Sequence, residues 1–224
     1  MMASQALDRR SMLRAAGIGG AALALAACNE GTMIAAPQLT RRSDTTPGSV
    51  TLDFASDFGV LNYAYALEQL EAAFYTQVVA NAAFATIFAA NERRVLTDLY
   101  DHEVIHREFF KAALGAAAIP GLTVDFSSID FASRTSVLTT ARTFEDLGVG
   151  AYNGAAKYLA SSAYLGVAGK IVSVEARHAS AIRNILSPGT GAFAPDTFDP
   201  AYTPTFVLSQ ADPFVVNSIT VINS

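Results

Sequence analysis

Two of the three histidines in this 224-residue chain follow a glutamate by three positions, His106 after Glu103 and His178 after Glu175. Residues three apart in an α-helix lie on the same face, so each pair can direct a carboxylate and an imidazole to one place. Carboxylate oxygens and imidazole nitrogens are common ligands of divalent metal ions. One such pair is often a surface contact, but two pairs in a chain with three histidines and eight glutamates favour a metal site.

Each Glu-x-x-His pair lies in the middle of an apolar stripe. Over residues 91–115, leucines precede the pair, and a phenylalanine and an alanine follow it, at alternating steps of three and four residues. Over residues 165–186, alanine and isoleucine flank the second pair in the same way. This period is typical of a helix with one buried face, so we expect both pairs to point into a helical core.

Two more glutamates, Glu68 and Glu145, lie on mostly apolar stripes, and each is followed seven residues later by a tyrosine, Tyr75 or Tyr152. These two stripes match at an offset of 77 residues, and the two Glu-x-x-His stripes match at an offset of 72. Such internal similarity predicts a duplicated helix hairpin. The sequence leaves two roles open for these tyrosines: core aromatics, or partners of the ligands, because a buried phenol needs a hydrogen-bond partner that a ligand carboxylate could supply.

The elements that must position these side chains are four helices, joined by two short connections and one long crossover. Short connections make antiparallel neighbours of the first and second helices, and of the third and fourth. The crossover spans about residues 116–132 and carries apolar residues of its own. The predicted helices cover residues 58–80, 91–115, 133–161 and 165–186.

Four glutamates and two histidines on inward faces create an electrostatic problem. Burial of one isolated carboxylate costs several kcal/mol, and four carboxylates close together also repel one another. Two divalent cations would neutralise four carboxylates, and each imidazole could supply a nitrogen lone pair. Because oxygen ligands dominate, the set favours two iron or two manganese ions.

This arrangement resembles the ferritin-like superfamily, in particular exported ferritin-like domain proteins related to desiccation-associated proteins. The resemblance covers residues 58–187 and implies an all-α, ferritin-like four-helix bundle of two duplicated hairpins. It also implies a dimetal centre that reacts with oxygen or peroxide, with Fe(II) oxidation, peroxide reduction or peroxide disproportionation as the candidate activities. The rival hypothesis is a non-enzymatic scaffold or stress protein of the cell envelope with a structural metal site. The metal ligands that the resemblance implies are Glu68, Glu103, His106, Glu145, Glu175 and His178.

Two positions near these ligands leave alternatives open. Glu71 also lies on a buried row and competes with Glu68 as the ligand from the first helix. We favour Glu68, because it shares the glutamate-to-tyrosine spacing with Glu145, and we place Glu71 beside the ligands with the two tyrosines. His102 precedes Glu103 by one residue and points about 100° away from it, so we expect it at the surface or just behind the ligands.

Residues 1–27 have the pattern of an export signal. Arg9 and Arg10 precede a short Ala/Gly/Leu-rich run over 15–27, which has 13 residues where a membrane-spanning helix needs about 20. The paired arginines resemble a twin-arginine signal. The residues that end at Cys28 resemble a bacterial lipobox, which would make this cysteine the lipidated first residue of the mature chain. We therefore expect the protein in the periplasm or cell envelope, held to the membrane only by this lipid.

The segments on either side of the bundle have different compositions. Residues 28–57 show no apolar period and are predicted to be a tether. Residues 188–224 contain five prolines, with short β-like runs at 205–208 and 214–221, and are predicted to be an extended arm packed on the bundle. The formal net charge of −5, without a basic stripe, argues against nucleic-acid binding. Metal ions and oxygen or peroxide are the expected partners, with association into homo-oligomers as a further expectation.

Overall fold

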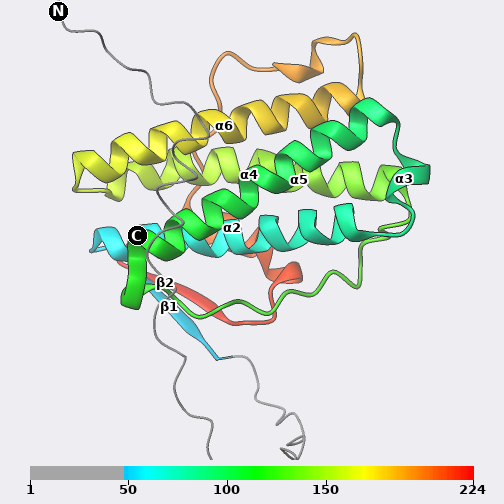
Figure 1. The fold of residues 1–224 in the computed structure, drawn as a ribbon. Helices are drawn as coiled ribbons and strands as arrows, with labels where there is room; N and C mark the ends of the chain where they lie inside the picture. The colour runs from blue at the N-terminus through cyan, green and yellow to red at the C-terminus, as the bar shows by residue number, and fades with distance from the viewer. Residues whose placement is uncertain (1–47) are drawn as a thin grey trace, which may run out of the picture. The chain divides into compact units, whose positions relative to one another are not determined.

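The computed structural model describes residues 48–224, and within them four long helices form a bundle (Figure 1). The expected export signal, Cys28 and most of the expected tether lie outside the described residues. No helix in the described part of the chain is long and apolar enough to cross a membrane. The elements, in chain order, are β1 (Val50–Asp53), α2 (Asp57–Ala80), α3 (Phe84–Ile87), α4 (Ala90–Leu114), α5 (Arg134–Ala155), α6 (Ser162–Leu186), α7 (Pro204–Ala211) and β2 (Ile219–Ile222).

The long helices pack as two hairpins. α2 lies mainly against α4, and α5 lies mainly against α6, with α3 in the connection of the first hairpin. Residues 115–133 run along the bundle from the end of α4 to the start of α5. The predicted helices, their pairing and the long crossover are therefore confirmed, and the long elements of the described chain are all helices.

Serine side chains determine where three of these helices begin. The hydroxyls of Ser56, Ser133 and Ser161 accept hydrogen bonds from backbone N–H groups in the first turns of α2, α5 and α6. Such caps satisfy donors that have no partner within the helix. Asp57, the first residue of α2, accepts hydrogen bonds from the backbone N–H groups of Ala160 and Ser161, at 2.7 and 3.0 Å. It therefore joins the start of α2 to the connection between α5 and α6.

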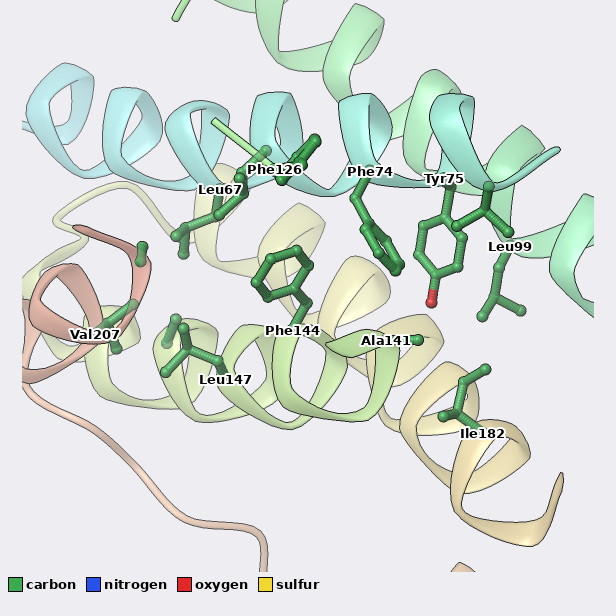
Figure 2. Close-up of a cluster of buried hydrophobic side chains, with 14 of the residues drawn as sticks. Leu67, Phe74, Tyr75, Leu99, Phe126, Ala141, Phe144, Leu147, Ile182 and Val207 are labelled. Carbon is green, nitrogen blue, oxygen red and sulfur yellow. The ribbon is translucent and has the colours of Figure 1, made fainter. Parts of the chain in front are cut away.

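The core is built around Phe74 of α2 (Figure 2). The centroid of its ring lies 5.2 Å from that of Phe144 on α5, and 6.0 and 5.8 Å from those of Phe126 and Phe131 in the crossover. Edge-to-face and tilted contacts of this kind are favourable aromatic geometries. The crossover therefore covers the bundle with its own apolar side chains.

The predicted tether needs correction at its end. Residues 50–53 form β1, which pairs in parallel with β2 from the C-terminal arm, Val50 opposite Ile219 and Leu52 opposite Val221. The side chains of Val50 and Leu52 are buried, whereas that of the residue between them is exposed. Two alternating apolar residues are too few to indicate a strand in a polar segment, so only the pairing with β2 reveals it.

The arm also needs correction, because it contains a helix. Residues 205–208 are predicted to be β-like but lie in α7. Pro204 occupies the first turn of α7, where its missing N–H costs nothing. The hydroxyl of Thr203 caps the helix by accepting a hydrogen bond from Phe206 N at 3.3 Å. Of the second β-like run, 214–221, only the last residues lie in a strand.

The arm lies on α5 at two glycines. The N–H of Tyr202 donates to Gly150 O at 2.8 Å. A Cβ atom on Gly154 would lie 1.7 Å from Tyr202 O, and one on Gly150 would lie 2.2 Å from the Tyr202 ring. The lack of side chains at these positions therefore lets the backbone of the arm reach the helix.

We expect Gly154→Ala to destabilise the fold by about 1–3 kcal/mol, because the new methyl group displaces the backbone of Tyr202. Gly166→Ala is the matched control. Gly166 is exposed on α6 with open space around it, so the better helix former should stabilise the fold by about 0.5–1 kcal/mol. Urea unfolding of both variants measures the difference. Equal stabilisation by the two substitutions would contradict the docking of the arm on α5.

Candidate metal centre

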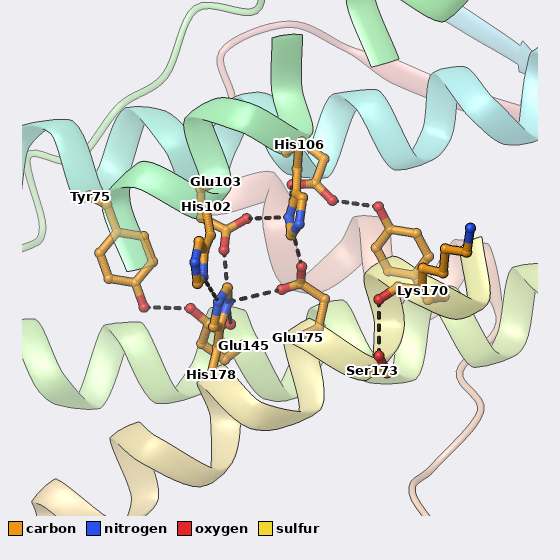
Figure 3. Close-up of polar contacts among 11 residues, drawn as sticks. Tyr75, His102, Glu103, His106, Glu145, Lys170, Ser173, Glu175 and His178 are labelled. Carbon is orange, nitrogen blue, oxygen red and sulfur yellow. Dashed lines mark hydrogen bonds and ion pairs between the residues drawn. The ribbon is translucent and has the colours of Figure 1, made fainter. Parts of the chain in front are cut away.

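Six side chains from the four long helices converge in the interior of the bundle (Figure 3). Four of them are glutamates with no exposed surface. The histidines are nearly as buried, since the side chain of His178 is 4% exposed and that of His106 is 12% exposed. The structure thus brings together every predicted ligand: Glu68 from α2, Glu103 and His106 from α4, Glu145 from α5, and Glu175 and His178 from α6.

One set of donor atoms, here called the His106 group, surrounds Nδ1 of His106. This nitrogen lies 3.0 Å from Glu175 Oε1, 3.4 Å from Glu103 Oε2 and 3.5 Å from Glu68 Oε2. Glu103 and His106 lie three residues apart on α4, so one turn of this helix supplies two of the four atoms. α2 and α6 supply the other two.

A second set, the His178 group, surrounds Nδ1 of His178. This nitrogen lies 2.8 Å from Glu103 Oε1, 3.3 Å from Glu145 Oε2 and 3.6 Å from Glu175 Oε2. Glu103 and Glu175 therefore belong to both groups. Each presents one carboxylate oxygen to the His106 group and the other oxygen to the His178 group.

Eight buried atoms of these two groups make no well-directed hydrogen bond among the described residues, although they lie within ion-pair distance of one another. They are both oxygens of Glu103 and Glu175, one oxygen each of Glu68 and Glu145, and Nδ1 of both histidines. Unpartnered polar atoms of this kind are uncommon in protein interiors and point to a missing ligand or ion. Atoms that bind one ion at about 2.1 Å lie about 3.0–3.4 Å from one another in octahedral or tetrahedral geometry. The separations of 2.8–3.6 Å are therefore compatible with metal ions bound between these atoms.

Two tyrosines orient the glutamates that belong to a single group. The Tyr75 hydroxyl donates to Glu145 Oε1 at 2.5 Å, and the Tyr152 hydroxyl donates to Glu68 Oε1. Burial raises the pKa of both phenols, so they remain protonated donors at neutral pH. Each hydrogen bond crosses the bundle between α2 and α5 and leaves the second carboxylate oxygen to face its group. Each tyrosine therefore lies beside a carboxylate of the cluster, and this carboxylate belongs to the other hairpin rather than to the glutamate seven residues earlier.

Without a metal ion, protons must balance the clustered carboxylates. Burial alone would lower the pKa of His106 and His178, but the surrounding carboxylates outweigh it and raise the pKa of each to about 12. Burial raises the pKa of Glu103 well above its ordinary value and that of Glu145 to about 7. For Glu175 burial acts in the same direction, but the two histidines outweigh it and lower the pKa to about 2. Metal binding would therefore release protons, because a ligand atom must be unprotonated.

Glu71 lies near both groups but belongs to neither. It is 4% exposed, and burial together with the surrounding glutamates raises the pKa of its carboxyl group well above the ordinary value. Gly148 makes room for it, since a Cβ atom at 148 would lie 3.1 Å from Glu71 Oε1. Residue 148 is the counterpart of residue 71 at the offset of 77, so the two hairpins differ here. The sequence leaves Glu68 and Glu71 as alternatives, and the structure places only Glu68 in a group.

His102 makes a contact that the sequence alone does not specify. Its Nδ1 lies 2.8 Å from Nε2 of His178, and the two rings lie edge to edge and nearly parallel, at 14°, with centroids 5.1 Å apart (Figure 3). His102 therefore lies behind His178, on the side away from Nδ1 and the carboxylates, and part of its ring is exposed. Helical periodicity places it on the flank of α4, but only the packing of α4 against α6 brings His178 to it.

Comparison with known proteins agrees with this architecture. No curated protein matches the chain. The family model of the ferritin-like domain matches residues 56–188, more than half of the chain. The match covers all four long helices and the six clustered side chains. The chain therefore belongs to the ferritin-like domain family.

Proposed function

We propose that the bundle binds two iron or two manganese ions, one in the His106 group and one in the His178 group. The observation that carries this proposal is the set of buried, unpartnered donor atoms. Two divalent ions carry four positive charges, which balance the four clustered glutamates when both imidazoles are neutral. Most of the donor atoms are carboxylate oxygens, and hard oxygen ligands favour iron or manganese.

The protein residues would hold the two ions in place and shield them from bulk water. Glu103 and Glu175 would hold both ions, because each presents one oxygen to either group. A bound pair of these metals supplies electron transfer to or from oxygen or peroxide. The glutamates have no exposed surface, so bulk water is excluded from the ligand oxygens. His106 is the most exposed of the six side chains, so small substrates would reach the centre from its side.

On this basis the protein is an oxidoreductase, either a ferroxidase or an enzyme that reduces or disproportionates peroxide. Metal analysis of the purified protein, combined with electrode measurements of oxygen and peroxide consumption with Fe(II) or Mn(II), tests this. We expect two ions per chain and measurable consumption. Two bound ions without consumption would favour the non-enzymatic scaffold with a structural metal site, whereas failure to bind metal would contradict the metal proposal itself.

Substitutions on α2 distinguish the two candidate ligands of that helix. Glu71→Gln is expected to leave both ions bound, because glutamine has the shape of the protonated carboxyl group that burial favours here. Glu68→Gln is expected to weaken binding in the His106 group at least about tenfold, since it removes a ligand charge. Calorimetric metal titrations measure both. Loss of an ion in Glu71→Gln, with normal binding in Glu68→Gln, would show that Glu71 and not Glu68 is the ligand from α2.

We also propose that the protein is exported and anchored through a lipid on Cys28, from the pattern of its first residues. Cys28→Ser is expected to move the protein from the membrane to the soluble fraction, because the lipid would be its only membrane attachment. Replacement of Arg9 and Arg10 by lysine should block export through a twin-arginine route, whereas a general secretory signal tolerates this change. Cell fractionation measures both. Unchanged membrane association of the serine variant would rule out the lipid anchor.

A further inference from the structure

The ligand set repeats between the two halves of the bundle, but the surroundings of the two ligand histidines do not. Nε2 of His178 lies 2.8 Å from Nδ1 of His102. No hydrogen bond joins Nε2 of His106 to another side chain in the described part of the chain, and that ring is the more exposed of the two. At the offset of 72, the counterpart of His102 is Val174, which has no side-chain hydrogen-bonding atom. The two halves therefore differ in both sequence and structure, because only His178 has a histidine beside its Nε2.

Metal bound to Nδ1 of His178 would place the proton of this imidazole on Nε2, where His102 lies within hydrogen-bond distance. Nδ1 of His178 faces the three carboxylates of its group, so this is the nitrogen that would bind a metal ion. A neutral imidazole has one N–H, which must then be on Nε2 and must donate to Nδ1 of His102. His102 accepts this bond and keeps its own proton on Nε2. A fixed acceptor behind a metal-binding imidazole holds the ring in orientation and makes its ligand nitrogen more basic.

We propose that His102 is a positioning residue that makes the His178 group the tighter of the two metal positions, so that it fills first. This inference rests on the proposed dimetal function. His102 acts through His178, because its own Nδ1 points at His178 Nε2 and it belongs to neither donor group. In the His106 group, no side chain of the described residues supplies such an acceptor and the ring is more exposed, so it is held less firmly. The two positions, alike in their ligands, therefore differ in affinity.

The test is an anaerobic titration of the full metal-free protein with Co(II), followed by visible absorption and calorimetry. The wild type should bind two ions in two steps. His102→Ala should weaken the tighter step by about 10–100-fold and leave the other step within about twofold. His102→Asn should restore most of the tighter step, because its carboxamide oxygen can take the place of the accepting Nδ1. Val174→Ala, the change at the counterpart position, should alter neither step by more than about twofold.

A second pair of variants assigns the affected step to the His178 group. His178→Ala should remove the tighter step, and adding His102→Ala to that variant should change the remaining step no further. Thermal unfolding confirms that each variant is folded. Equal weakening of both steps by His102→Ala, no weakening of either step, or failure of His102→Asn to recover the lost affinity would overturn the inference. A wild type that binds no pair of ions would instead overturn the proposed dimetal function, and the two failures are thereby distinguished.

Discussion

Without metal, the protein is expected to lose stability as the pH rises from about 5 to about 8, whereas metal-loaded protein is expected to keep its stability over this range. The reason is that the folded, metal-free cluster holds protons that the unfolded chain releases. Each such proton lowers the free energy of unfolding by about 1.4 kcal/mol for every unit of pH increase. We expect a total loss on the order of a few kcal/mol.

The sign of this pH dependence follows from the direction of each pKa shift. The pKa of Glu145 is raised from 4.5 to about 7. The unfolded chain therefore releases this proton at lower pH than the folded protein does, and stability falls as the pH rises across that interval. The pKa values of His106 and His178 are raised from 6.5 to about 12, so their stabilising contribution is complete below pH 6.5 and falls above it. Glu175 acts in the opposite direction, because its pKa is lowered from 4.5 to about 2, and its contribution is lost only in more acidic solution. Metal-free stability should therefore be greatest near pH 5.

Thermal unfolding between about pH 5 and pH 8, with EDTA or with excess Mn(II), measures this effect. The difference in melting temperature between loaded and metal-free protein should widen as the pH rises, because metal binding releases protons. A variant with His106 and His178 both replaced by glutamine should show a flatter dependence, since two proton carriers are gone. A metal-free melting temperature that rises from pH 5 to pH 8 would contradict the charges assigned to the cluster.

Glu103→Gln is expected to lower the metal affinity of both positions by about 10–100-fold or more. Loss of a residue that only supports a metal ligand already lowers affinity by about this factor, and Glu103 is itself a proposed ligand. The reason is geometric, since Glu103 presents one oxygen to His106 and the other to His178. Turnover should be lost as well. The metal-free fold should tolerate the change, because burial and the neighbouring Glu175 already favour the neutral form of this carboxyl group, and glutamine has the same shape.

Glu145→Gln is the matched control for this prediction. Glu145 belongs only to the His178 group, so its replacement should weaken one binding step and leave the other within about twofold. Titration with Co(II) or Mn(II), together with thermal unfolding of the metal-free variants, separates loss of binding from loss of folding. If Glu103→Gln affected a single step, as Glu145→Gln should, Glu103 would not be shared between the two positions.

The clustered side chains could be predicted from the sequence, because residue type and helical period both indicate that these glutamates and histidines face the core. Glu103 and His106 stand three apart on an apolar stripe, so their common face follows from helix geometry alone. The sequence also pairs tyrosines with glutamates by spacing, and the structure shows Tyr75 of α2 donating to Glu145 of α5. Such statements need only the period of a helix and the fact that hairpins pack around one core.

Other parts of the site depend on contacts between helices, which periodicity does not contain. The contact of His102 with His178 arises where α4 meets α6, and the place of Glu71 depends on the space left by Gly148. Each is a single-residue departure from the duplication, visible in the sequence as a mismatch but interpretable only in three dimensions.

The short elements on either side of the bundle, within the described residues, are harder to predict for a related reason. β1 is four residues long and is stabilised by pairing with β2, in which Ile219, the partner of Val50, lies 169 positions later in the sequence. α7 begins with a threonine cap and a proline in a segment whose β-branched and aromatic residues also favour a strand. Short elements of this kind take their form from the surface on which they pack, here α5 for α7 and α2 for β1.

The central claim is that two metal ions share Glu103 and Glu175 inside the bundle, and anomalous diffraction from crystals of the Mn(II)-loaded protein tests it most directly. The account predicts two anomalous peaks per chain, about 3.5–4 Å apart, one beside His106 Nδ1 and one beside His178 Nδ1. A single peak, or two peaks that do not both contact Glu103 and Glu175, would contradict it.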